Sequence, residues 1–328
     1  MKQGIVFLLA LWAALFATAA TAAGHRPAEV SVGYVTQWPT PAQFAQDRET
    51  FEYALGLDVN WVPFGSGDAM NTALAENRIQ MAHSQGHVPF LVGVSRGLDL
   101  TMVGIAVAYP DYDNCILRDD AGITPANIAQ LAGNRIALRP GSLSHFRLLQ
   151  VLEHLGLDPS GVEIVATADD IATANALQQG EVVMACASGG ALRAISTLGK
   201  PLLTGAEQEA LGLGLFDVIT ARTAFVNDHP DIVQSFMDVV EAANKQWRIN
   251  PDPMRAAIAR AAQMDQAGAN RSLTEFRFPS IGEQKSEAWM GGGIAAYSKD
   301  LAEFLVAHGQ LEQALDSYES FVTTRFLR

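Results

Sequence analysis

Hydrophobic and polar positions along the chain switch repeatedly between two periods, one typical of strands and one typical of helices. Residues 30–35 alternate apolar and small side chains, which predicts a strand. Residues 41–55 follow with Phe44, Phe51 and Leu55 at helical spacing, which predicts a helix. The order of strand and then helix recurs over the first two thirds of the chain. It predicts mainly parallel sheets flanked by helices, an α/β fold.

The same periodicities predict the remaining strands and helices. Strands or apolar strand-like runs are expected at 59–64, 79–82, 98–107, 135–138, 162–166, 182–186 and 216–221. Helices are expected at 68–77, 88–95, 142–155, 171–178 and 190–198, with a further helix starting at Thr124 and Pro125. Beyond about Phe225 the pattern is helical, at 230–250, 253–264, 282–297 and 299–307. Two α/β blocks and a helical tail indicate one chain that crosses twice between two lobes.

Composition narrows the class of protein. A length of 328 residues suggests about two domains at roughly 100–200 residues each. With 49% hydrophobic and 17% charged residues, the chain is not intrinsically disordered. Its 35 acidic and 22 basic residues argue against a nucleic-acid partner, because neutralising phosphates needs an excess of Lys and Arg.

The first 22 residues have the composition of a signal peptide. Lys2 is followed by a continuous apolar run at 5–16 and by small residues up to Ala22, where we expect cleavage. A membrane anchor is the alternative, but this run is shorter than the ~20 residues that span a bilayer. No Cys stands at the cleavage site, so the mature protein is expected to be exported and soluble.

The two cysteines, Cys115 and Cys186, both lie in apolar strand-like runs. This setting favours two small buried hydrophobic residues. A disulfide between them remains open in an oxidising compartment, since the sequence does not show whether their geometry allows it.

Motifs for catalysis, metal binding or cofactor binding are missing from the sequence. His83 and His87 are four residues apart, but no third metal ligand is near them in sequence, so we expect no metal site. The segment 65–67 is glycine-rich but lacks the lysine of a phosphate-binding loop. We therefore expect no cofactor and no catalytic residues.

Polar turns do stand out at the ends of predicted strands, at 36–40, 84–86, 140–144 and 187–190. In open α/β sheets the carboxyl edge of the strands is where ligands bind. Ser and Gly at helix starts leave backbone N–H groups free for an anion. Each single turn is explained by ordinary helix capping, but four turns on one edge in two lobes indicate a ligand cleft between them.

The order and spacing of several segments carry a resemblance to a known family. These segments are 33–34 with 38–41, 64–67, 82–89, 112–115, His145 at its helix start, 216–218, Tyr318 and 322–326. Together they resemble the periplasmic substrate-binding proteins of ABC importers, specifically the taurine and aliphatic-sulfonate binding family, over nearly all of the mature chain. Many members have an aromatic residue in the 188–190 region, where this chain has only small residues.

The resemblance implies a type II periplasmic-binding-protein fold of two lobes that close on a ligand. Lobe 1 would comprise 24–114 and 218–328, lobe 2 would comprise 115–217, and the hinge crossings would lie near Asn114 and Asp217. The resemblance also implies a periplasmic monomer that delivers its ligand to an ABC permease and its ATPase. Closure would be a shift of population toward the closed form.

Taurine is a short zwitterion, so its site needs a pole for the ammonium and a pole for the sulfonate. Asp217 is the first candidate for the ammonium and Asp113 the second, because carboxylates in apolar runs are rarely buried without a partner. An internal hydrogen bond at the hinge is the alternative role for Asp217. The expected ligand-binding residues are Trp38, Gln85, Gly86, Asp113, Asn114, Ser142, Ser144, His145, Ser188 and Asp217.

Other functions remain open from the sequence. One alternative is a binding protein for another small amine or zwitterion. A second is an enzyme of the pyrimidine-precursor type on the same fold, although we find no matching Cys-rich or Lys-containing motif. A third is a ligand carrier that docks to a sensor kinase.

Overall fold

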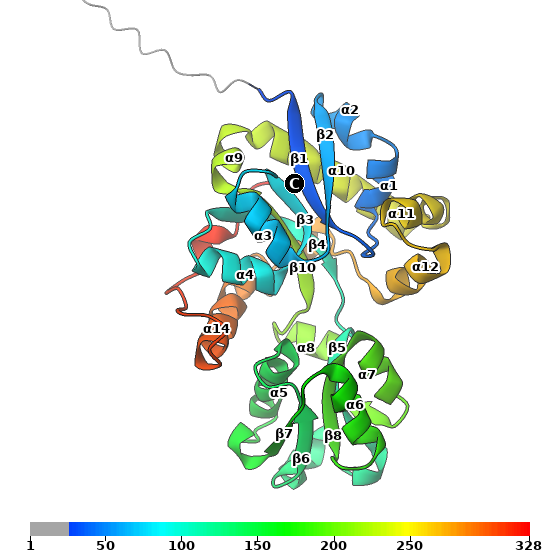
Figure 1. Cartoon of the computed structure of the whole chain (residues 1–328), viewed down its shortest axis with the longest axis vertical. Helices are drawn as coiled ribbons and strands as arrows, with labels where there is room; N and C mark the ends of the chain where they lie inside the picture. Colours follow the sequence, from blue (N-terminus) through cyan, green and yellow to red (C-terminus); the bar gives the residue numbers. More distant parts are fainter. Residues whose placement is uncertain (1–25) are drawn as a thin grey trace, which may run out of the picture.

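Two five-stranded sheets, each with its own helices, divide the chain into two lobes stacked along the long axis (Figure 1). This computed structural model describes residues 26–328, so the expected signal peptide at 1–22 lies outside the described residues. In the part of the chain that the model describes, no helix combines the length and the apolar character needed to cross a membrane.

The first sheet has the strand order β2-β1-β3-β10-β4. The strands are β1 (Glu29–Val35), β2 (Asp58–Phe64), β3 (Met81–Gly86), β4 (Leu100–Ala108) and β10 (Phe216–Arg222). As expected, β1 pairs in parallel with β2 and β3. The late strand β10 inserts antiparallel between β3 and β4, which makes the sheet mixed. All nine residues of β4 are buried, as is typical of a strand covered on both faces.

The helices of the first lobe come from both ends of the chain. They are α1 (Ala42–Asp47), α2 (Thr50–Leu55), α3 (Gly67–Ala75), α4 (His87–Ser95), α9 (Thr223–Asp228), α10 (Pro230–Ile249), α11 (Arg255–Ala261), α12 (Gln266–Glu275), α13 (Ile281–Gln284) and α14 (Gly293–Ala307), with short 3₁₀ turns η4 (Asp252–Met254) and η5 (Glu319–Phe321).

Two helices expected to be continuous are broken. The helix expected at 41–55 divides into α1 and α2 at Glu49, which has a φ of 54°. The prediction of one continuous helix at 282–297 was wrong, because α14 begins only at Gly293. Gly292 has a φ of 145°, a conformation that other residues rarely adopt. A Cβ at Gly293 would lie 2.4 Å from the carbonyl oxygen of Ala288, so this turn needs glycine.

The second sheet has the order β7-β6-β8-β5-β9. Its strands are β5 (Asp113–Arg118), β6 (Arg135–Leu138), β7 (Glu163–Ala166), β8 (Met184–Ser188) and β9 (Gly199–Pro201). Its helices are α5 (Leu143–His154), α6 (Asp170–Gln178), α7 (Gly189–Ile195) and α8 (Gly205–Ala210), with the 3₁₀ segments η1 (Asp119–Ala121), η2 (Pro125–Leu131) and η3 (Pro159–Gly161). The strands β6, β7 and β8 are parallel, whereas β5 is antiparallel to β8 and β9.

The chain crosses between the lobes at 109–112 and again at 202–215. The strand β5 begins at Asp113 in the second sheet, and β10 begins at Phe216 in the first. Sheet membership therefore moves Asp113 and Asn114 to the second lobe, and Phe216 and Asp217 to the first. With these four residues reassigned, the division of the chain into two lobes remains our proposal.

One arginine connects the two crossings. The backbone of Arg277 exchanges two hydrogen bonds of 2.8 Å with Ala108, at the end of β4. Its guanidinium forms ion pairs with Glu209 on α8 and with Glu283. Since Ala108 precedes the first crossing and α8 lies within the second, Arg277 holds both segments against the first lobe.

The cysteines form a disulfide, so the preference for two separate buried residues was wrong. Cys115 on β5 and Cys186 on β8 are directly opposite each other in the antiparallel register. This pairing depends on how two distant strands align, which the local apolar pattern does not reveal. The bond joins the first strand of the second lobe to the centre of its sheet.

We expect loss of this disulfide to lower the free energy of unfolding by about 2–4 kcal/mol, because the bond closes a loop with a sequence separation of 71 residues. The test is a denaturant titration of the oxidised protein and of the variant carrying Cys115→Ala and Cys186→Ala. The protein treated with a reductant is the control and should match the variant. Equal midpoints for the oxidised protein and the variant would contradict the expectation.

Candidate functional site

A buried carboxylate lies at the end of the first sheet that faces the second lobe. Asp217 is 5% exposed, and Tyr109 donates a hydrogen bond of 2.6 Å to its Oδ1. Burial raises the pKa of Asp217 to about 7, and hydrogen bonding from Tyr109 and then from Trp38 lowers it only in part. Burial and the Asp217 charge both raise the pKa of Tyr109, so its hydroxyl keeps the proton that it donates.

Trp38 covers this pair from the turn after β1. Its ring centroid is 5.2 Å from that of Tyr109, 5.7 Å from that of Tyr112 and 4.5 Å from that of Phe276. Tyr109 and Tyr112 belong to the first crossing, and Phe276 follows α12. The aromatic rings therefore form an apolar wall beside the carboxylate at the point where the chain leaves the first lobe.

The end of β3 forms the other side of Asp217. Gly86 is its partner in the ladder, and a Cβ at Gly86 would lie 3.7 Å from the Asp217 carboxylate. Gln85, expected to contact ligand, is fully buried and has internal partners at both ends of its amide. Its Oε1 accepts a bond of 2.6 Å from Thr220, and its Nε2 donates to Asn71 at 2.7 Å. The Gln85 amide thus fixes β3 against β10.

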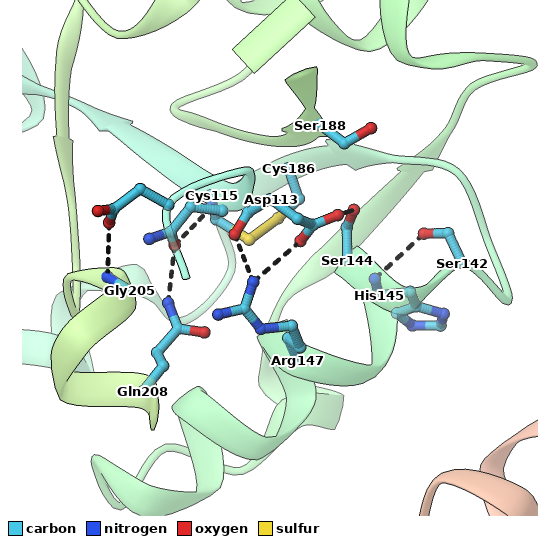
Figure 2. A network of polar contacts seen from close by, with 12 residues as sticks. Asp113, Cys115, Ser142, Ser144, His145, Arg147, Cys186, Ser188, Gly205 and Gln208 are labelled. Carbon is cyan, nitrogen blue, oxygen red and sulfur yellow. Dashed lines mark hydrogen bonds and ion pairs between the residues drawn. A yellow bond between two sulfur atoms is a disulfide. The ribbon is translucent and has the colours of Figure 1, made fainter. Parts of the chain in front are cut away.

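The second lobe holds a buried ion pair at the start of β5 (Figure 2). Arg147, only 2% exposed, donates from Nη1 to the backbone oxygen of Asp113 and lies 3.4 Å from its Oδ1. The Ser144 hydroxyl donates to Oδ2 of the same carboxylate. Burial raises the pKa of Asp113, and the Arg147 charge and the Ser144 hydrogen bond offset this in part.

The neighbouring Asn114 joins β5 to the second crossing. Its Oδ1 accepts hydrogen bonds from the Cys115 backbone at 2.8 Å and from Gln208 Nε2 at 2.9 Å. Its Nδ2 donates to the carbonyl of Leu203. A cavity of about 10 Å³, lined in part by Arg147, Asn114 and Gln208, has room for about one water molecule. Asn114 therefore supports the hinge, and its amide is already occupied.

Three of the expected polar residues cap helices or bind side chains nearby. Ser142 caps α5 by accepting a hydrogen bond of 3.2 Å from the backbone of His145. His145 Nδ1 in turn accepts from the backbone of Gly141 at 3.1 Å. Ser188 donates to Asp170 through its hydroxyl at 2.5 Å and its backbone at 3.1 Å. These residues hold the turns that face the first lobe.

The structure thus gathers the expected residues at two facing ends. Trp38, Gly86 and Asp217 lie at the end of the first lobe. The second lobe presents the remaining expected residues other than Gln85, namely Asp113, Asn114, Ser142, Ser144, His145 and Ser188.

Sequence reasoning missed three residues that belong with these two groups: Tyr109, Arg147 and Tyr297. The hydroxyl of Tyr297 on α14 is buried without a hydrogen-bond partner, and burial raises its pKa. Its ring reaches across to Phe146 on α5, at a centroid distance of 5.8 Å. Arg147 had a signal in the sequence, because it stands in a helix with apolar neighbours, three residues after Ser144.

Among residues 26–328, no group of three or more His, Cys, Asp or Glu side chains gathers in a way that could hold a metal ion. His83 and His87 are both buried, and burial lowers the pKa of His83 to about 4 and that of His87 to about 3. The two rings are therefore neutral near pH 7. His87 Nε2 is hydrogen-bonded to Ser298 at 2.8 Å.

Comparison with known proteins places this geometry in a family. A family model described as NMT1/THI5 like matches residues 40–253. The chain is 27% identical over 306 residues to the taurine-binding periplasmic protein of Escherichia coli strain K12, covering 91% of this chain and 92% of that one.

Two solved structures share the fold. The periplasmic aliphatic sulphonate binding protein SsuA of Escherichia coli is similar at a TM-score of 0.66 and 19% identity, over 88% of this chain and 96% of that one. The desulfurization enzyme DSZB is similar at a TM-score of 0.57 and 17% identity, over 92% and 98% of the two chains. The fold is therefore that of periplasmic binding proteins, and it also carries enzymes.

We expect Tyr109→Phe to raise the pKa of Asp217 above about 7, because the substitution removes the hydrogen bond that stabilises the ionised carboxylate. The measurement is a pH titration of the Asp217 carboxyl carbon by NMR. Tyr53→Phe is the matched control, since Tyr53 is 91% exposed and has the same hydroxyl to lose. An unchanged Asp217 titration in Tyr109→Phe would contradict the assigned role of this hydrogen bond.

Proposed function

As the chain belongs to the NMT1/THI5-like family, we propose that it is an exported solute-binding protein that captures taurine, or a similar small aliphatic sulfonate, between its lobes. The observation that carries the proposal is the burial of Asp217 at the lobe boundary. Among the described residues, Tyr109 donates to its Oδ1 and the Trp38 side chain also stabilises its charge, but no cationic side chain pairs with it, so the carboxylate is left to pair with a cationic ligand. The whole-length similarity to a relative named as taurine-binding supports the same ligand.

The ammonium pole is Asp217. An ammonium group donating to Oδ2 replaces the hydration that the buried carboxylate lacks, and its charge favours the ionised form. Trp38 stands beside this position and covers the two methylene groups of taurine, with a cation–π contribution from its ring. This arrangement selects a cation at one end of a short ligand.

The sulfonate pole is the start of α5. This 12-residue helix begins after Ser142, so its first backbone N–H groups and the end of its dipole favour an anion. Asp113 lies close by and would repel a sulfonate, but its pairing with Arg147 compensates that charge. From the other lobe, the unpartnered hydroxyl of Tyr297 adds a donor.

Binding is coupled to closure and not to chemistry in this proposal. The two poles belong to different lobes, so a ligand that touches both stabilises the closed form by its differential contacts. The closed monomer then delivers taurine to an ABC permease and its ATPase. The disulfide supports an oxidising, extracytoplasmic compartment for the mature chain.

Taurine is expected to raise the free energy of unfolding by about 2.7 kcal/mol when it is present at 100 times its dissociation constant. The test compares thermal unfolding with taurine, ethanesulfonate, choline and glycine. Stabilisation by choline alone would overturn the sulfonate assignment in favour of another small amine.

Asp217→Asn is expected to weaken taurine binding by about 1–3 kcal/mol, the contribution of a charged hydrogen bond. Calorimetry should show a smaller effect on ethanesulfonate, which has no ammonium for Asp217 to bind. Asp228→Asn, at an exposed carboxylate of the same lobe, is the control and should bind taurine like the unmodified protein. Equal losses for both ligands would indicate that Asp217 only supports the hinge.

A further inference from the structure

A small cluster of side chains joins the two lobes beside the proposed sulfonate pole. We call it the clasp, and it consists of Gly141, His145, Phe304, His308 and Gln310. The His145 ring on α5 lies 5.3 Å from Phe304 and 5.1 Å from His308, between centroids, at the end of α14. Gln310 Nε2 donates to the Gly141 carbonyl at 2.6 Å. The clasp therefore connects the turn before α5 to the first lobe.

Gly141 is required in this cluster. Its φ is 77°, and a Cβ at this position would lie 2.3 Å from Gln310 Nε2. Both polar groups of its backbone are engaged, since its carbonyl accepts from Gln310 and its N–H donates to His145 Nδ1. The turn that carries Ser142 is thus held from both lobes at once.

The hydrogen bond from Gly141 fixes the protonation state of His145. Because Nδ1 accepts the backbone N–H at 3.1 Å, this nitrogen carries no proton and the ring is neutral. On the facing helix, His308 Nδ1 is hydrogen-bonded to the Phe304 carbonyl at 2.8 Å, a contact in which the ring is the donor. A proton added to His145 Nδ1 would break its bond to Gly141 and place a positive charge against His308.

We propose that the clasp is a proton-sensitive connection between the lobes, which holds them together while His145 is neutral and releases them when His145 is protonated. His145 and His308 act here as positioning residues for the turn at Ser142. The inference rests on the two-lobe closure of the proposed function and adds control by pH to it.

The direction of the pH effect follows from the burial of His145. Burial, and secondly the charge of His308, lower the pKa of His145 below its ordinary value of about 6.5 in this structure, where the clasp is formed. The arrangement with the clasp formed therefore binds fewer protons than an open form in which the ring is solvated. As pH falls below about 6.5, the equilibrium shifts toward the open form.

Other titratable groups near the two helices act differently. Glu153 lies on α5, and Lys299, Asp300 and Glu303 lie on α14. Partial desolvation, and then the charges of Glu303 and Glu153, raise the pKa of the exposed Asp300, so acid favours the arrangement in which these carboxylates lie near one another. Asp217, with a pKa of about 7, also titrates between the two pH values of the experiment. Because these groups add their own pH dependence, variants at the clasp are needed to isolate the histidine effect.

The experiment measures the radius of gyration of the ligand-free mature chain by small-angle X-ray scattering at about pH 7.5 and about pH 5.5. We expect the unmodified protein to expand at the lower pH, and His145→Gln and His308→Gln to lose most of that expansion. His154→Gln, an exposed histidine on the same helix, is the control and should expand like the unmodified protein. Gln310→Leu lacks the hydrogen bond to Gly141, so its radius of gyration should be large at both pH values.

Two outcomes would overturn the proposal. One is an unmodified protein with the same radius at both pH values, and the other is an equal expansion in His145→Gln, His308→Gln and His154→Gln. Far-UV circular dichroism at both pH values confirms that each variant is folded. Since no ligand is present, failure of taurine to bind would leave this result intact, and the two proposals fail separately.

Discussion

The hydrogen bond from Tyr109 to Asp217 joins the two segments on which the two-lobe arrangement depends. Tyr109 follows β4 at the first crossing, and Asp217 stands in β10 just after the second. The bond therefore holds both connections side by side at the end of the first lobe, next to Trp38. Arg277 also joins the two crossings, through the Ala108 backbone next to Tyr109 and through Glu209 on α8.

Charges buried near a boundary between lobes reduce stability unless each has a partner. Asp113 has Arg147 and Ser144, so its charge is paired, although Nε and Nη2 of the buried Arg147 have no hydrogen-bond partner among the described residues. Asp217 has only neutral partners, Tyr109 and Trp38, and its raised pKa reflects the remaining cost of its burial. The proposed site is therefore asymmetric, because the buried carboxylate of the first lobe has no cationic partner and that of the second lobe is paired with Arg147.

The local hydrophobic pattern was sufficient to predict most strands and the α/β class, because each strand and each helix shows its own periodicity within a few residues. It failed where distant segments decide the outcome. The break before α14 depends on the close approach of Gly293 to the carbonyl of Ala288, and the Cys115–Cys186 bond depends on strand register. Gln85 was expected to meet ligand, but its amide is used by Asn71 and Thr220, from elements remote in sequence. Conversely, Asp217 could be identified from the sequence, because a carboxylate within an apolar run is a local signal that needs no knowledge of distant segments.

The position of β10 between β3 and β4 has a consequence for biosynthesis. A chain made from its N-terminus produces β3 and β4 more than a hundred residues before the strand that pairs with both, so the first sheet stays split with two bare edges until β10 emerges. The second lobe is one continuous stretch whose strands and disulfide lie within residues 113–201. The second lobe can therefore fold first. The incomplete first lobe is then the part of the nascent chain that needs protection from aggregation.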